Sequence, residues 1–160
     1  MRIAFLIFLM ATLLSEATLA QSKPEFIVFE HPSAPGKVSE DKLHRSLQFA
    51  AQELHVSGEL QCSFYVFHVS PEDAKSAGVE MTSVWKTRRG GEYRYELWVV
   101  GEPTDEVYSA LAVSLFKDSF SLSLEQEQAK RVKDIVAMKL AMTLSAKERQ
   151  PTAKERKPKH

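Results

Sequence analysis

Residues 59–69 form the segment that most constrains the fold. Alternate positions fall into two sets, Leu60, Cys62, Phe64, Val66 and His68 on one face and Gln61, Ser63, Tyr65, Phe67 and Val69 on the other. Both sets become apolar toward the end of the segment. An edge strand usually keeps one polar face, whereas a strand covered on both sides in the middle of a sheet is apolar on both. The pattern therefore predicts a central strand that is covered on both faces.

A strand–helix–strand unit is predicted around this segment. Residues 26–29 are an unbroken apolar run of strand length, followed by a loop rich in Pro and Gly. Ser39 is suited to cap a helix, and Glu40 and Asp41 would lie at the positive end of its dipole. Apolar residues then follow at helical spacing to about residue 55. Such a unit is a right-handed crossover, so the two strands are expected to be parallel.

Gly90 and Gly91 predict a β-hairpin between residues 81–89 and 92–101, because both can adopt the positive φ angles of a two-residue turn. The turn fixes a register. One face is expected to pair Thr82 with Val99, Val84 with Leu97, Lys86 with Tyr95 and Arg88 with Tyr93. The other is expected to pair Ser83 with Trp98, Trp85 with Glu96, Thr87 with Arg94 and Arg89 with Glu92. The apolar cluster far from the turn supports this register.

Two further helices are predicted after the hairpin. Thr104 is the expected cap of the first, and its buried stripe is Tyr108, Leu111, Ala112 and Leu115. The second runs from near Ser123 to about Lys147 and has a wide apolar face. A short helical turn is also expected at residues 71–75. The predicted fold is α+β: one small domain with a mixed sheet of about four strands (strand–helix–strand, then a hairpin) and helices packed mainly on one face.

Residues 1–20 have the pattern of a signal peptide. Arg2 precedes an apolar run at residues 3–14, and small residues occupy the cleavage positions before Gln21, ending in Thr18-Leu19-Ala20. The apolar run is shorter than the roughly 20 residues needed to cross a bilayer. An uncleaved anchor or a buried helix is the alternative. We expect an exported protein, periplasmic or secreted, with no transmembrane segment in the mature chain.

The remainder divides into a globular domain at residues 21–146 and a basic tail at residues 147–160, which is expected to be disordered. The tail contains six Lys or Arg and two Glu, so it could attract an anionic surface, or it could be a silent terminus. Cys62 is the one cysteine of the chain, and its place on an apolar strand face predicts a buried thiol without catalytic use.

Two histidines define a candidate site at the ends of the parallel strands. His31 closes the first strand and His68 lies near the end of the second, with Asp73 shortly after it. Open sheets of this kind bind ligands outside the carboxyl ends of their strands. Two imidazoles and a carboxylate suit acid–base chemistry or a metal ion. The alternative that we favour is that His68 is a packed strand residue and His31 only a loop residue, so no catalytic residue or metal ligand is assigned.

The hairpin is the second candidate site. The predicted register places Trp85, Trp98 and Arg94 on one face, where they could stack on a carbohydrate or a base or anchor a protein partner. The alternative, which the pattern favours, is that the long C-terminal helix covers both Trp.

The sequence contains no nucleophile elbow, no Cys-x-x-Cys, no dinucleotide-binding glycine motif and no His-Glu-x-x-His. The order of predicted elements is also that of small zincin-type metallopeptidases, but the corresponding helix contains Tyr108-Ser-Ala-Leu-Ala112 in place of metal ligands.

The leading prediction is thus a non-catalytic binding module without a cofactor. One alternative is a small hydrolase or metal-dependent enzyme with its site around His31 and His68. Another is a degenerate peptidase-like domain that lacks metal ligands.

Overall fold

The computed structural model describes residues 24–57 and 63–148. The predicted signal peptide, Cys62 and almost all of the predicted tail lie outside these residues. In chain order the elements are β1 (Phe26–Glu30), α2 (Glu40–Glu53), β2 (Phe64–Val69), α3 (Pro71–Ser76), β3 (Ser83–Arg89), β4 (Glu92–Val100), α4 (Asp105–Ser119) and α5 (Gln126–Glu148). They form a single small α+β domain, as the sequence predicts.

The four strands form one mixed sheet in the order β1-β2-β4-β3. β1 and β4 both run parallel to β2, and β3 runs antiparallel to β4. The crossover and the hairpin are therefore both confirmed. The hairpin register is also confirmed from Ser83↔Trp98 to Arg89↔Glu92, and Gly90 and Gly91 adopt positive φ angles of 61° and 89° at the turn.

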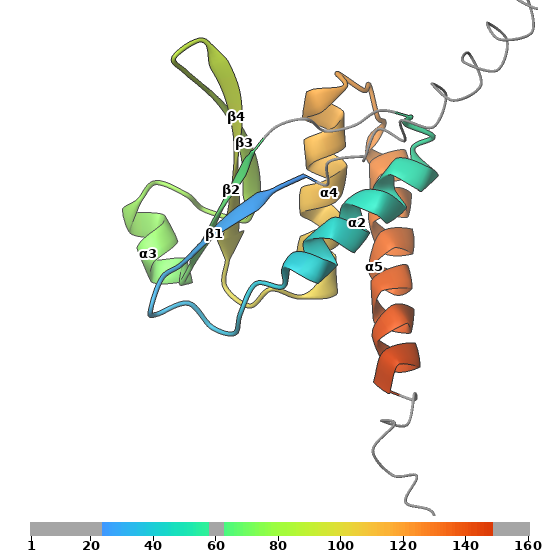
Figure 1. Ribbon diagram of the computed structural model, residues 1–160, viewed down its shortest axis with the longest axis horizontal. Coiled ribbons are helices and arrows are strands. Elements are labelled where there is room, and N and C mark those ends of the chain that lie inside the picture. Colours follow the sequence, from blue (N-terminus) through green and yellow to red (C-terminus); the bar gives the residue numbers. More distant parts are fainter. Residues whose placement is uncertain (1–23, 58–62, 149–160) are drawn as a thin grey trace, which may run out of the picture.

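Three helices cover one face of this sheet. Figure 1 shows α2, α4 and α5 together on one side of the strands. The core between these helices and the sheet contains Phe64, Val66, Leu97 and Val99 from the strands, packed with Leu43, Leu111, Leu115, Val136 and Leu140 from the helices. The predicted buried stripe of α4 is confirmed, since Tyr108, Leu111, Ala112 and Leu115 are all at most 2% exposed.

Local signals position α2 and α3 as expected, whereas Thr104 stands at the N-cap of α4 but makes no side-chain capping hydrogen bond. The Ser39 hydroxyl accepts a hydrogen bond from the backbone N–H of Lys42 and caps α2. The Tyr108 hydroxyl accepts another, from the backbone N–H of Ser39 at 2.8 Å, and so ties the start of α2 to α4. Burial raises the pKa of the Tyr108 phenol. Ser70 caps α3 in the same way as Ser39 caps α2.

The opposite face of the sheet differs from the prediction. α5 packs against α4 and α2, so it does not cover the two tryptophans. α3 is the helix that Figure 1 shows on this side, beside the carboxyl ends of the strands. The central position of residues 64–69 is confirmed, but their second face is covered less than the alternation suggests: Phe64, Val66 and His68 are buried, whereas Tyr65, Phe67 and Val69 are only partly buried.

Among the helices in the described residues, none is both long enough and apolar enough to span a membrane.

Candidate functional site

Five aromatic side chains lie together on the face of the sheet opposite α2, α4 and α5. We call this set the aromatic face; its members are Phe29, Tyr65, Phe67, Trp85 and Trp98. All four strands contribute. Phe29 of β1 pairs with Phe67 of β2, and Phe67 pairs with Trp98 of β4. Trp85 of β3 pairs with Glu96 and is therefore a diagonal neighbour of Trp98. The result is a row of rings that crosses the sheet from one edge to the other.

The rings of the row pack against one another. Phe67 lies between Phe29, at 5.3 Å and 13° between ring planes, and Trp98, at 4.9 Å and 26°. Phe29 also stacks on Tyr65 at 6.4 Å and 9°. Trp85 is tilted by 43° against Trp98 at 6.1 Å. The faces of the inner rings are thus occupied by neighbouring rings, and it is mainly their edges that remain to contact another molecule.

The two ends of the row are open to solvent. Phe29 is 48% exposed and Trp85 is 42% exposed. Burying the exposed half of such a ring would be favourable by about 1 kcal/mol, so each end of the row can contribute to the binding of another molecule. Exposure at both ends with partly buried rings between them marks a continuous apolar surface.

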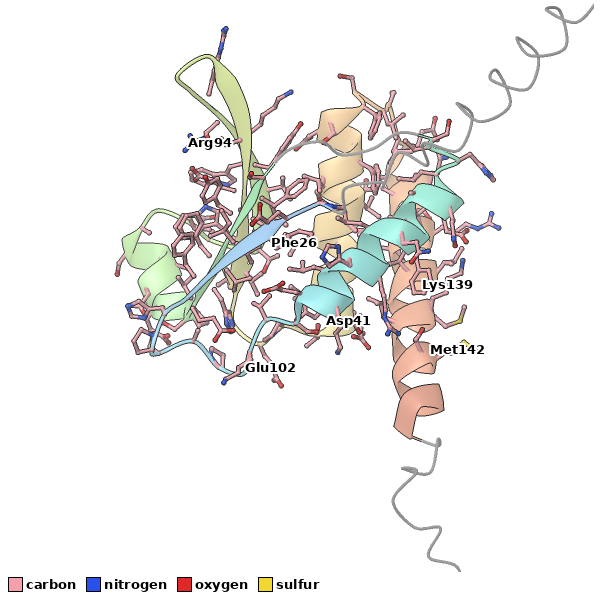
Figure 2. All side chains as sticks on the ribbon, viewed as in Figure 1. Phe26, Asp41, Arg94, Glu102, Lys139 and Met142 are labelled. Atoms are coloured by element: carbon pink, nitrogen blue, oxygen red, sulfur yellow. The ribbon has the colours of Figure 1, made fainter. Side chains whose placement is uncertain are left out.

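Charged and polar groups lie beside the rings. The Arg94 guanidinium lies 5.6 Å from the centre of the Tyr65 ring, which is a cation–π contact. The Thr87 hydroxyl donates a hydrogen bond to the Glu96 carboxylate at 3.4 Å. Within the described part of the chain, neither Arg94 nor Glu96 lies in an ion pair. Figure 2 shows Arg94 on the side of the sheet away from the helices, near the hairpin.

The structure therefore brings together Trp85, Trp98 and Arg94, the three binding residues that the hairpin register predicts. Sequence reasoning missed Phe29, Tyr65 and Phe67. The alternation of β2 already separates Tyr65 and Phe67 from the core residues. Joining them to the tryptophans requires knowing that β4 is inserted beside β2, which no local pattern specifies.

The two histidines of the other candidate site are neighbours through their backbones. The His31 N–H donates to the His68 carbonyl at 2.8 Å, so the two strand ends meet as predicted. Their side chains lie in different environments. His68 is fully buried, and its Nε2 donates to the Gly101 carbonyl at 2.9 Å. Its Nδ1 has no hydrogen-bond partner among the described residues. The side chain of His31 is exposed.

Asp73 is the centre of a hydrogen-bonded cluster with His31, Ser33 and Ser70. The hydroxyls of Ser33 and Ser70 both donate to its carboxylate, the latter at 2.7 Å. His31 Nδ1 lies 3.2 Å from the same oxygen and 2.8 Å from the Ser33 hydroxyl. The hydrogen bonds from Ser33 and Ser70, helped by the charge of His31, lower the pKa of the Asp73 carboxyl.

The direction of these hydrogen bonds shows what the cluster can do. The Ser33 hydroxyl proton points to the Asp73 carboxylate and not to His31 Nδ1, and the backbone N–H of Ser33 also points to that nitrogen, at 3.4 Å. A serine activated for nucleophilic attack needs the reverse arrangement. The cluster joins the loop after β1 to the start of α3. Among the described residues there is also no group of three His, Cys, Asp or Glu side chains placed to hold a metal ion.

Comparison with known proteins adds no assignment, since no family model, no curated protein and no solved structure matches this chain.

Proposed function

We propose that the protein is an exported, non-catalytic binding module and that its binding surface is the aromatic face. One observation carries the proposal: a row of aromatic side chains crosses all four strands on the face that α2, α4 and α5 leave uncovered, and both ends of the row are exposed. Aromatic side chains and Arg are the residue types that contribute most to binding energy at protein interfaces. The export half of the proposal is supported by the pattern of residues 1–20.

The chemistry around Asp73 supports an enzyme less well. His31 and His68 meet through their backbones, but the buried Nε2 of His68 contacts the Gly101 carbonyl, and His31 contacts Ser33 and Asp73. The hydrolase and metal-dependent enzyme remain alternatives, as does the degenerate peptidase-like domain. None of them has support comparable to that for the aromatic face.

The proposal is tested by removing the exposed ends of the row. The double variant Phe29→Ala/Trp85→Ala changes only exposed rings, so we expect it to fold. The matched control is Met138→Ala/Met142→Ala, which removes two exposed apolar side chains from α5. Each immobilised protein is incubated with a periplasmic or extracellular extract, and the molecules that it retains are identified and purified.

We expect at least one purified binder to lose tenfold or more in affinity for the aromatic variant and to bind the methionine control as it binds the wild type. The loss of two exposed aromatic anchors, each worth about 1–2 kcal/mol, accounts for this size of effect. Binders that show equal affinity for all three proteins would contradict the proposal.

A further inference from the structure

We infer that the aromatic face binds an amphipathic helix of a partner protein, laid across the strands. This inference rests on the proposed function and names the partner class. Four observations support it: the construction of the sheet, the orientation of the rings, the size of the face and its two charges.

The sheet is built for a layer on each side. The sheet is mixed, but its three strands β1, β2 and β4 are parallel, and parallel strands are usually covered by helices on both faces in all-parallel sheets. Here α2, α4 and α5 cover one face, while α3 lies on the other side only near the carboxyl ends of the strands. β2 is accordingly apolar on both faces, with Phe64 and Val66 in the core and Tyr65 and Phe67 in the aromatic face. A helix from a partner would supply the missing part of the second layer.

The packing of the inner rings favours protein over a carbohydrate or nucleic acid stacked along the row. Sugars and bases bind aromatic residues by stacking on ring faces. In this row both faces of Phe67 are occupied, by Phe29 and by Trp98, at 4.9 to 5.3 Å. Ring edges are well suited to aliphatic side chains, which pack without a required plane.

The size of the face suits a single helix. Four strands spaced about 4.8 Å apart place the ends of the row about 14 Å apart, and Tyr65 and Phe67, two residues apart on β2, are about 7 Å apart along the strand. This footprint is well below the roughly 800 Å² per partner of a stable protein interface. A helix about 10 Å wide would cover it with about three turns.

Two charged residues beside the rings indicate which charges the partner helix would carry on its flanks. Arg94 and Glu96 alternate with the buried Tyr95 and Leu97 on β4 and lie on the same side of the sheet as the aromatic face. Neither is in an ion pair within the described residues. A complementary helix therefore has apolar residues at positions i, i+3, i+4 and i+7 and an acidic side chain beside Arg94. A basic side chain beside Glu96 would complete the match.

The test is selection from a displayed library of 20-residue peptides, half with a helix-forming frame and half with a strand-forming frame. The wild-type protein is the bait, with no counter-selection against Phe29→Ala/Trp85→Ala. We expect enrichment of the helical frame with apolar residues at helical spacing. The best peptide should lose at least tenfold in affinity for the aromatic variant and keep its affinity for Met138→Ala/Met142→Ala.

Charge reversal provides the second measurement. Arg94→Glu should weaken the selected peptide about three- to tenfold, and replacing the acidic residue of the peptide with Lys should restore most of the loss. Enrichment of the strand-forming frame would overturn the inference. Two further results would do so: binding of oligosaccharides that depends on the aromatic face, and self-association that depends on it.

All three of these contrary results would leave the proposed function in place, because each is a form of binding at the aromatic face. If no peptide, oligosaccharide or second copy of the chain distinguishes the aromatic variant from the wild type, both the inference and the proposed function fail.

Discussion

Asp73 links two parts of the chain that the sequence separates by 40 positions. Its carboxylate accepts hydrogen bonds from Ser33 in the loop after β1 and from Ser70 at the start of α3. Both bonds favour the ionised form, so the pKa of Asp73 is lowered in the folded protein. Because the folded pKa lies below the unfolded one, this carboxylate contributes stability above the unfolded pKa of about 3.9 and loses it as the pH falls through the folded pKa.

We therefore expect Asp73→Asn to have a lower melting temperature than the wild type at pH 7, and the difference to shrink as the pH falls from about 4 through the lowered pKa of the folded protein, where the wild-type carboxyl becomes protonated. Thermal unfolding followed by circular dichroism between pH 2 and pH 7 measures this. Glu72→Gln, a neighbouring carboxylate on the same helix, is the control and should not reproduce the pH profile. An equal destabilisation of Asp73→Asn at every pH would show that the charge is unimportant.

At the scale of elements, α5 presents two apolar stripes with different surroundings. Val132, Val136 and Leu140 lie in the core, at 6%, 0% and 1% exposure. Met138 and Met142 are 56% and 66% exposed, and Figure 2 shows Met142 on the outer side of the helix. The sequence predicts a single wide apolar face on this helix, and the structure buries only the part that contains Val132, Val136 and Leu140.

Leu140→Ala should therefore destabilise the protein by about 2–5 kcal/mol, since it leaves a cavity between α5 and the rest of the core. Met142→Ala should change the free energy of unfolding by about 0.5 kcal/mol or less. Urea denaturation of the two variants and the wild type gives both values. Similar effects for the two variants would mean that α5 packs through a different face.

The elements themselves were largely predictable because their signals are local. Ser39 and Ser70 are caps that act within one helical turn, and the Gly90-Gly91 turn fixes the hairpin register by its own geometry. The placement of layers was not predictable in the same way. Whether α5 lies on the Leu97 side or on the Trp98 side of the sheet depends on which side α2 and α4 occupy, because α5 packs against those two helices. The apolar character of both faces of β2 gives equal reason for either choice.

For the candidate sites too, local signals could be read from the sequence, whereas contacts that depend on the assembled sheet could not. Trp85, Trp98 and Arg94 could be grouped from the sequence because a turn connects their strands. The relation between His31 and His68 was predicted only at the level of the backbone, since the alternation of β2 turns the His68 side chain into the interior. Phe29 completes the aromatic face from the far edge of the sheet, and this contact depends on the assembled strand order.

On the scale of the whole molecule, the export proposal depends on residues that precede the described fold. If residues 1–20 are a signal peptide, the mature N-terminus is Gln21, because Thr18 and Ala20 are the small residues at the cleavage positions. We expect expression in a bacterial host to deliver a protein beginning at Gln21 to the periplasm, as determined by N-terminal sequencing. Thr18→Arg/Ala20→Arg should retain the uncleaved form in the membrane fraction. A full-length wild-type protein in the cytoplasm would contradict export.

The strand order also has a consequence for folding. β3 and β4 are adjacent in sequence and meet through a two-residue turn, so their pairing closes a short loop at little entropic cost. The parallel pairs of β2 with β4 and of β1 with β2 each require a longer segment to be brought together, and such non-local contacts form slowly. β1 lies at the edge and pairs with β2 alone. β1, which carries Phe29, should therefore be the last strand to join the sheet and the first to open. A partner bound to the aromatic face would slow amide hydrogen exchange most in this strand.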